Sequence, residues 1–302
     1  MVDIVIVNWN SGEYLKMCLT SILKKDNNNL INRIIIIDNN SKDLFPADIP
    51  NDNRVILIQN NQNVGFSKAC NQGFRQCTAE FILLLNPDAM LLPDTLSDSI
   101  HFMRQHNDID ILGCCLLDDQ GVRTKSCCRF PSPVRIFFDA AGLSKIAPKI
   151  FTPASIMTDW DHLESRSVDM VMGAFMFMRK NVFEKNGFFD ERFFVYYEEV
   201  DFSKRLSAIQ GKIFYNAFIS AVHSGEGTTK SVKAFRLFLS LKSRLQYAKK
   251  HFRPKGFIIV WISTFFVEPF TRILFLLSKG KVNEIGETLK GFMLLIKNKP
   301  LH

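Results

Sequence analysis

The sequence predicts an α/β protein with a mainly parallel sheet flanked by helices and a C-terminal helical extension. Three observations predict this fold. Short apolar runs alternate with amphipathic stretches in the first half of the chain, polar residues follow the apolar runs, and a basic, apolar segment ends the chain. Such alternation of strands and helices is typical of parallel sheets with helices on both faces.

The predicted strands and helices follow from the hydrophobic periodicity. Strands are expected within residues 4–7, 34–37, 55–58 and 81–85, and helices over 13–23, 67–77 and 93–106. Further strands are expected within residues 168–178 and 213–222. Residues 118–166 show no clear period, so loops and short elements are expected there.

Polar residues gather where the predicted strands end. Asn8 and Asn10 follow the first strand, Asp38 ends the second, the segment with Asn63 and Gly65 follows the third, and residues 86–88 follow the fourth. Asn, Asp and Gly are also ordinary turn residues. Ligands of parallel sheets bind at the carboxyl ends of the strands, and four polar loops at one edge favour a binding crevice.

Three carboxylates lie within four residues at Glu198, Glu199 and Asp201. Crowded carboxylates raise one another's pKa and can provide a general base near neutral pH. The alternative is a solvated acidic start of a helix, which the helix dipole would stabilise. The Phe-Phe-Val-Tyr-Tyr run at residues 193–197, before this cluster, argues against full exposure.

Asp88 and His223 are candidate metal ligands. Asn86-Pro87-Asp88 follows an apolar strand, and a carboxylate there can bind a hard cation such as Mg²⁺ or Mn²⁺, although Asn-Pro also opens turns. His223 ends a predicted strand before the glycine-containing segment 224–228, where a structural role or a metal or phosphate contact is possible.

The start of the chain and its cysteines favour a cytoplasmic protein. Met1 runs directly into a predicted strand, so we expect no signal peptide. The seven cysteines include two adjacent pairs without the looped spacing of a metal cluster, so we interpret them as reduced thiols.

The charge divides the chain into a predicted catalytic domain, residues 1–229, and a basic amphipathic helical tail, residues 230–302. The first part holds 23 Lys and Arg against 27 Asp and Glu, and the tail holds 15 against three, a net charge of +12. Glu268, Pro269 and Arg272 interrupt the apolar segment 257–277, which argues against a helix that spans a membrane.

On a helical wheel of the tail, Thr264, Glu268, Thr271 and Arg272 share one face. Residues Val282, Ile285, Leu289, Phe292, Met293 and Ile296 form a second, apolar stripe with lysines nearby. Cationic amphipathic helices of this kind can lie on an anionic membrane surface. The alternatives are a helical cap on the main domain and a contact between copies of the chain in a homo-oligomer.

The motifs together resemble glycosyltransferase family 2, whose inverting enzymes have a GT-A fold, and most of all its bacterial rhamnosyltransferase-like branch. The resemblance covers about residues 2–229. The matching segments are residues 5–10, 37–41, 63–66, 71–73, 85–88 and 173–175, and the run from Gly187 through Glu198-Glu199-Val200-Asp201-Phe202 to Arg205.

The resemblance implies a role for each matched residue. Asn8, Asp38 and Asn63 would line the nucleoside pocket, Asp88 would bind the metal with His223, and Glu199, beside Glu198, would be the base. The remaining donor-binding residues are expected in the same motifs at Asn10, Gly65, Phe66, Asn71 and Asn86. The sequence departs from the family pattern in two places, because Asn86 replaces the first Asp of D-x-D and Glu199 replaces the usual Asp.

The implied reaction is one in-line displacement that inverts the anomeric carbon and needs Mg²⁺ or Mn²⁺. The donor is a nucleotide-diphosphate sugar, dTDP-L-rhamnose first, and a UDP-hexose or UDP-galactofuranose second. The acceptor is a saccharide on a polyprenyl-diphosphate carrier in bacterial surface polysaccharide (O-antigen-like, lipopolysaccharide) synthesis. Such an enzyme is expected in the cytoplasm, peripheral on the inner face of the cytoplasmic membrane.

Other classes fit less well. A nucleotidyltransferase would carry a basic Gly-rich loop after the first strand, and a nicotinamide dehydrogenase would carry G-x-G-x-x-G there. Residues 8–12 match neither pattern. The pI of about 9.1 would suit a nucleic-acid-binding protein, but the positive charge lies in the apolar tail and no recognition motif is visible, so no nucleic-acid partner is expected.

Overall fold

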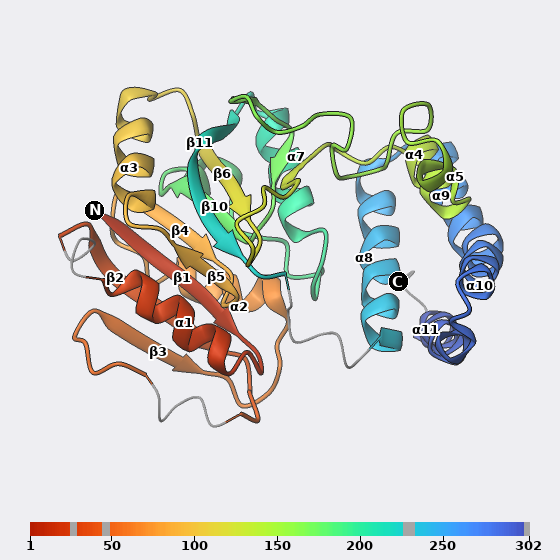
Figure 1. The fold of residues 1–302 in the computed structure, drawn as a ribbon, viewed down its shortest axis with the longest axis horizontal. Coiled ribbons are helices and arrows are strands. Elements are labelled where there is room, and N and C mark those ends of the chain that lie inside the picture. Colours follow the sequence, from red (N-terminus) through yellow and green to blue (C-terminus); the bar gives the residue numbers. More distant parts are fainter. Residues whose placement is uncertain (25–28, 44–48, 226–232, 299–302) are drawn as a thin grey trace. The chain divides into compact units, whose positions relative to one another are not determined.

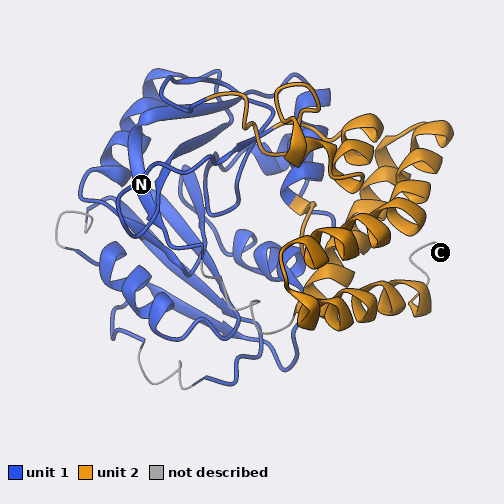
Figure 2. Ribbon diagram, turned by 45° about the vertical axis from the view of Figure 1, so that its right-hand side comes forward, with its two compact units in different colours: residues 1–128, 161–191, 199–228 blue, residues 129–160, 192–198, 229–302 orange. Residues whose placement is uncertain are grey.

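The computed structural model describes residues 1–24, 29–43, 49–225 and 233–298. The chain forms two compact units (Figure 2). Unit 1 comprises residues 1–128, 161–191 and 199–228, and unit 2 comprises residues 129–160, 192–198 and 229–302. The predicted division at residue 229 stays a prediction, and unit 2 contains two earlier segments besides the tail.

The first half of unit 1 is the predicted parallel sheet (Figure 1). Strand β1 (Val2–Asn8) pairs in parallel with β2 (Ile31–Asp38) and β4 (Phe81–Leu85), and β2 pairs in parallel with β3 (Val55–Gln59). Strands β1 and β4 are buried along their whole length. This burial explains why they read as continuous apolar runs rather than alternating ones.

The second half of the sheet is mixed. Strand β10 (Phe175–Arg179) lies antiparallel between β4 and β6 (Ile111–Leu117), and β6 is parallel to β11 (Ile213–His223). Strand β5 (Ala89–Leu91) is antiparallel to β11. The order is β3-β2-β1-β4-β10-β6-β11-β5, with β8 (Arg166–Ser167) also on β11 and a separate pair of β7 (Cys127–Cys128) and β9 (Met170–Val171).

Helices cover both faces of the sheet, as predicted. Ile4 and Ile6 of β1 share a core with α1 (Glu13–Ile22) and α3 (Thr95–Gln105). Val5 points to the other face, where a Cβ at Gly73 of α2 (Phe66–Phe74) would stand only 2.4 Å from its Cγ1. Glycine therefore allows α2 to lie close to β1. Helices α6 (Val182–Asn186) and α7 (Glu198–Ala208) precede β11.

Described by itself, unit 2 is helical. Its own core contains Leu241 and Leu245 of the long helix α8 (Lys233–His251), Val260 of α9 (Pro254–Ile262), and Phe292 and Leu295 of α11 (Ile285–Lys297). A Cβ at Gly291 would stand 3.0 Å from the carbonyl oxygen of Ala234, so glycine allows α11 to approach α8 closely. The elements are α4 (Pro133–Ala140), α5 (Leu143–Ile146), α8 (Lys233–His251), α9 (Pro254–Ile262), the π-helix η4 (Ser263–Val267), α10 (Glu268–Ser278), the 3-10 helix η5 (Val282–Glu284) and α11 (Ile285–Lys297).

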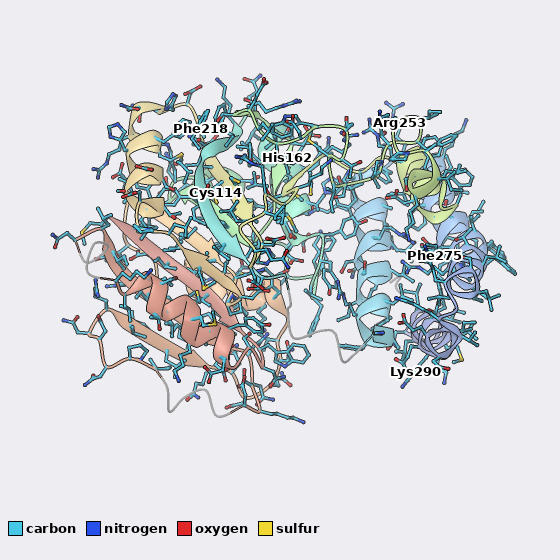
Figure 3. All side chains as sticks on the ribbon, viewed as in Figure 1. Cys114, His162, Phe218, Arg253, Phe275 and Lys290 are labelled. Atoms are coloured by element: carbon cyan, nitrogen blue, oxygen red, sulfur yellow. The ribbon has the colours of Figure 1, made fainter. Side chains whose placement is uncertain are left out.

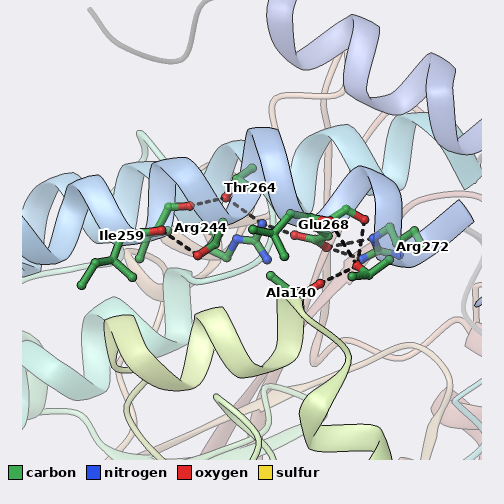
Figure 4. Close-up of polar contacts among 10 residues, drawn as sticks. Ala140, Arg244, Ile259, Thr264, Glu268 and Arg272 are labelled. Atoms are coloured by element: carbon green, nitrogen blue, oxygen red, sulfur yellow. Dashed lines mark hydrogen bonds and ion pairs between the residues drawn. The ribbon is translucent and has the colours of Figure 1, made fainter. Parts of the chain in front are cut away.

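A buried ion pair holds α10 to α8 (Figure 4). Arg244 donates to the Glu268 carboxylate and, over 2.8 Å, to Thr264 Oγ1. Arg272 donates to the other oxygen of Glu268 over 2.8 Å. Burial acts to raise the pKa of Glu268, but the charges of Arg244 and Arg272 outweigh burial and lower this pKa below its ordinary value.

Replacing Glu268 with Gln should lower the free energy of unfolding of the full chain by about 3 kcal/mol at pH 7. The substitution keeps the shape of the side chain but removes the carboxylate that pairs with the buried Arg244 guanidinium and has the largest electrostatic effect on it. Urea denaturation of the wild type and the variant measures the difference.

The matched control is Arg272→Met, because the Arg272 side chain is 46% exposed and its loss should cost less than about 1 kcal/mol. A lowered pKa means that Glu268 contributes its stability above its unfolded pKa of about 4.3. The difference between wild type and Glu268→Gln should therefore shrink as the pH falls through 4 and below. Equal stability at pH 7 would contradict the role of the ion pair.

Candidate active site

Asn8 and Asp38 lie side by side at the carboxyl edge of the sheet, because β1 and β2 pair in register at these two residues. Asn8 Nδ2 donates to Asp38 Oδ1 over 2.9 Å and to Ser41 Oγ over 2.9 Å. Both Asn8 and Asp38 are buried. The structure thus brings together two of the three residues predicted to line the nucleoside pocket.

Left-handed asparagines shape the loops after these strands. Asn10 and Asn40 have φ values of 54° and 63°, a conformation that asparagine tolerates better than most residues. The Asn10 amide donates to Ser41 Oγ over 3.0 Å, and Asn10 Oδ1 accepts from the Lys42 amide over 2.7 Å. The two loops are therefore tied to each other, with Asn10 inside the connection.

The third predicted pocket residue, Asn63, is held by Asn39. Asn39 Nδ2 donates to Asn63 Oδ1 over 2.8 Å, and Asn63 Oδ1 also accepts from the Gly65 amide over 2.9 Å. Gly65 has a φ of 89°, which favours glycine, and it turns the chain into α2 at Phe66. Asn39 was not among the predicted site residues, although its place directly after Asp38 was a signal for it.

Asn71 fastens α2 to the segment before α7. Its Nδ2 donates to the Phe189 carbonyl over 2.9 Å and to Glu191 Oε1 over 3.0 Å, and its Oδ1 accepts from the Phe189 amide over 3.0 Å. Asn71 is buried. In this structure the Asn71 side chain holds the backbone of Phe189 in place. The predicted contact of Asn71 with the donor stays a prediction.

Asp88 and His223 face each other across a strand pair. The amide of Ala89 donates to the Asn86 carbonyl over 3.1 Å, so residues 86–89 form a turn with Pro87 and Asp88 at its centre. The pairing of Ala89 with His223 then places Asp88 Oδ1 3.3 Å from His223 Nε2. The glycine segment predicted after His223 lies beyond the described residues from Glu226 onward.

This pair suits a divalent cation in its donor atoms. A carboxylate oxygen and an imidazole nitrogen are both ligands of Mn²⁺-like ions, and donor phosphates can complete such a site. Within the described ranges, no group of three or more His, Cys, Asp or Glu side chains is arranged to hold a metal. Burial, together with the charge of Asp88, raises the pKa of the nearby Cys18 thiol, so Cys18 stays protonated.

The two candidate bases differ in exposure. Glu198 is 2% exposed, whereas Glu199 is half-buried. A Cβ at Gly173 would stand 3.6 Å from Glu199 Oε1, and the neighbouring Ala174 carbonyl accepts from the Asn86 amide over 3.1 Å. Glu199 is thus connected through residues 173–174 to the turn that carries Asp88.

The chain enters α7 through a strained backbone. Tyr196 and Tyr197 have φ values of 67° and 71°, and left-handed residues other than glycine cost on the order of 1–3 kcal/mol each. Burial raises the pKa of Tyr197 to about 12, so its phenol is not a base near neutral pH. Strain of this kind gathers at functional sites and here directly precedes Glu198.

Asp201, the third carboxylate, is occupied with Arg205. Asp201 Oδ2 accepts from Arg205 Nε over 2.9 Å and is fully buried. Arg205 also donates to the carbonyls of Asn186 and Phe188. Asp201 therefore positions the segment that follows α6 through Arg205.

The sequence pattern of the family called Glycosyl transferase family 2 matches residues 3–187. The chain belongs to this family. Its sequence is 24% identical over 247 residues to the low-salt glycan biosynthesis hexosyltransferase Agl10 of Haloferax volcanii, which covers 80% of this chain and 73% of that protein. The family assignment decides for a glycosyltransferase over a nucleotidyltransferase.

Two further relatives are rhamnosyltransferases. Rhamnosyltransferase WbbL of Escherichia coli K12 is 26% identical over 257 residues, 82% of this chain and 92% of that protein. The N-acetylglucosaminyl-diphospho-decaprenol L-rhamnosyltransferase of Mycobacterium tuberculosis is 24% identical over 220 residues, 68% of this chain and 70% of that protein. This glycosyltransferase thus resembles the branch that its motifs predicted.

The fold is confirmed by solved structures. The mannosyltransferase PcManGT from Pyrobaculum calidifontis, solved with GDP-Man and Mn²⁺, superposes with a TM-score of 0.58 at 13% identity. The superposition covers 99% of this chain and 87% of that one. The glycosyltransferase therefore has the GT-A-like fold that the sequence predicted, with C-terminal helices.

Replacing Asp201 with Ala should lower the free energy of unfolding by about 2 kcal/mol, because the partly buried Arg205 loses its charged acceptor. Thermal and urea unfolding of the purified variant measure this loss. The matched comparison is Glu199→Gln, which should leave stability within about 0.5 kcal/mol. Asp201→Ala with wild-type stability would contradict the positioning role.

Proposed function

We propose that this glycosyltransferase inverts the anomeric carbon of L-rhamnose as it transfers the sugar from dTDP-L-rhamnose to a saccharide on a polyprenyl-diphosphate carrier. Two relatives are named as rhamnosyltransferases, and the name of one contains a diphospho-decaprenol acceptor. Surface-polysaccharide synthesis of the O-antigen type is the matching pathway. A UDP-hexose or UDP-galactofuranose donor is the second candidate.

The observation that carries the proposal is the assembly at one edge of the sheet. The Asp88–His223 pair is suited to a cation that neutralises a diphosphate, Asn8 and Asp38 lie at the neighbouring strand ends, and Glu199 is joined to the Asp88 turn through Gly173. A metal bridge, a nucleoside pocket and a base are the three parts that sugar transfer from a nucleotide diphosphate needs.

The proposed sugar transfer is a single displacement at the anomeric carbon. Glu199 accepts the proton of the acceptor hydroxyl, the acceptor oxygen forms a bond to the anomeric carbon, and the bond from that carbon to the diphosphate oxygen breaks. The nucleoside diphosphate leaves with the electron pair. Asp88 and His223 would hold a Mg²⁺ or Mn²⁺ ion, which would stabilise the leaving diphosphate.

Glu199 is the better placed of the two adjacent carboxylates. A base must reach the acceptor hydroxyl within hydrogen-bond distance. Glu198 is almost fully buried, whereas Glu199 is half-buried. Glu198 is assigned a supporting role next to the base.

The proposed enzyme works in the cytoplasm, at the inner face of the cytoplasmic membrane. A polyprenyl-linked acceptor cannot leave the bilayer, and an enzyme confined to the same surface meets it at a higher effective concentration. The net charge of +12 over residues 230–302 suits an anionic lipid surface.

The full chain should release a nucleoside diphosphate from a sugar nucleotide, fastest from dTDP-L-rhamnose, and EDTA should stop this release. Asp88→Ala should abolish transfer and weaken Mn²⁺ binding, because a main ligand is lost. A panel of dTDP, UDP and GDP sugars with calorimetry of Mn²⁺ binding measures both effects.

Ser97→Ala, a change at an exposed residue near the start of α3 whose hydroxyl donates to the Asp94 carbonyl, serves as the matched control. It should retain both metal binding and release. Full activity in EDTA would contradict the metal site. If no sugar nucleotide in the panel releases a nucleoside diphosphate, the proposal that the donor is a sugar nucleotide is wrong.

Glu199→Gln should lower kcat by about 10²- to 10⁴-fold, because it keeps the shape of the side chain and removes its basicity. Donor affinity should change little, since the base acts on the acceptor. Steady-state kinetics and calorimetric titration with the donor separate the two effects. A larger loss of kcat in Glu198→Gln would move the base to the neighbouring residue.

A further inference from the structure

The longest apolar helical run of unit 2 is formed by α9, η4 and α10. Its 25 residues, Pro254–Ser278, are long and apolar enough to cross a membrane by length and composition alone. Length and composition do not show whether such a helix crosses a bilayer, lies on one or packs in a protein core. The two sides of the run distinguish these cases.

One side of the run is fastened along its length to the rest of unit 2. Val260, Ser263, Thr264 and Glu268 are buried. Arg244 of α8 donates to Thr264 and Glu268, and Thr271 Oγ1 donates to the Ala140 carbonyl at the end of α4 (Figure 4). The polar face predicted from the helical wheel is thus the inner face, and its groups bind protein.

The other side is apolar and exposed. We define the docking face as Ile258, Ile262, Phe266, Phe270 and Leu274, whose exposed fractions range from 45% to 66%. Ile259, Phe275 and Leu277 are also exposed beside it. Between Lys255 and Arg272 the only charged residue is Glu268, which is buried. Exposed apolar patches of this kind mark interaction sites.

The π-helix keeps the docking face on one side. A strict repeat of four residues drifts by about 40° per step on a regular α-helix, since four residues turn through about 400°. Residues 258, 262, 266, 270 and 274 follow that repeat. The π turn at Ser263–Val267 is wider and rotates less per residue, so it offsets part of the drift.

Cations flank the docking face at both ends of the run. Arg253 and Lys255 precede it, Lys279 and Lys281 follow it, and all four are exposed. Helix α11 repeats the pattern, with exposed Leu289, Met293 and Ile296 beside exposed Lys290 and Lys297. Figure 3 labels Arg253, Phe275 and Lys290 on these helices. Exposed cations beside exposed apolar side chains suit contact with an anionic membrane surface, whereas the orientation of the run is decided by its inner face.

We propose that the docking face binds an anionic bilayer with the run Pro254–Ser278 lying in the plane of the membrane rather than across it. Crossing would place Glu268 in hydrocarbon and break its contacts with Arg244. Pairing with a second copy of the chain would bring two segments of charge +12 together. The proposal deepens the membrane location and rests on the proposed function for its purpose, but lipid binding is measured without any sugar transfer.

The first test is sedimentation of the full chain with vesicles of phosphatidylglycerol and phosphatidylcholine. The double variant Phe266→Asp with Phe270→Asp should bind at least about tenfold more weakly, since each buried Phe is worth roughly 1.5–3 kcal/mol. The matched control is Phe218→Asp, at a phenylalanine of unit 1 that is 83% exposed (Figure 3). It should bind vesicles as the wild type does.

The second test measures depth. All seven native cysteines are buried, so cysteines introduced at Ile258, Phe266 and Leu274 can carry a fluorescent label for quenching by brominated lipids. Equal, shallow depths at the three positions support the in-plane helix. A label at Phe266 deep in the bilayer, with the other two near its surfaces, would show a crossing helix and overturn the proposal.

Wild-type protein that ignores anionic vesicles, or a dimer that the Phe266 and Phe270 changes dissociate, would overturn the proposal in favour of a protein contact. Release of nucleoside diphosphate by the double variant should equal that of the wild type, because unit 1 is unchanged. Loss of vesicle binding therefore stays distinguishable from failure of the proposed chemistry.

Discussion

The antiparallel pairing of β5 with β11 is the constraint on which the candidate metal site depends. Asp88 and His223 are 135 positions apart in the sequence, and the Ala89–His223 pair places their side chains within 3.3 Å of each other. The pairing in turn requires the tight turn at residues 86–89, where proline fixes the backbone. The Ser224 amide continues the contact by donating to the Asp88 carbonyl over 3.1 Å. The three-residue strand β5 thus brings the two candidate metal ligands, Asp88 and His223, together.

The three carboxylates of one motif show how helix geometry divides neighbouring residues among different tasks. Successive residues of a helix point about 100° apart. Glu198 turns inward, Glu199 faces Gly173, and Asp201 reaches Arg205 one turn further along α7. A cluster that reads as one acidic group in the sequence therefore becomes three separate environments, and only one of them is partly accessible.

Much of unit 1 could be predicted because its signals are local. The runs at residues 4–7, 34–37 and 81–85 became β1, β2 and β4, and their continuous apolar character is typical of parallel strands that are buried on both faces. A strand within residues 168–178 was predicted and corresponds to β10, but its antiparallel place between β4 and β6 could not be predicted, since that place depends on long-range pairing. Residues 118–166 showed no period because their elements, such as α4 and α5, are short and packed among helices distant in sequence. Asn39 was missed at the site because its place directly after Asp38 was its only signal, and its bonds to Asn63 and Val64 are visible only in the structure.

In the tail, the shared face of Thr264, Glu268 and Thr271 was predicted correctly, but their partners were not. The sequence does not distinguish Arg244 from the surface arginines of a basic helix, because its partner Glu268 belongs to another helix, 24 positions away. The second predicted stripe divides in the structure, with Phe292 in the core and Leu289, Met293 and Ile296 exposed. Periodicity shows which residues share a side, whereas burial depends on what packs there.

The π turn at Ser263–Val267 makes this one stretch of the tail tolerant of losing a residue. A π turn amounts to one residue added to a regular helix. Loss of one residue from this stretch would restore regular α-helix, and Ile258 and Leu274 would keep nearly the same relative direction. Loss of one residue elsewhere in the run would instead rotate everything after it by about 100° relative to everything before it. Among homologous sequences, a gap at the π turn would therefore preserve the tail surface, whereas a gap elsewhere in the run would change it.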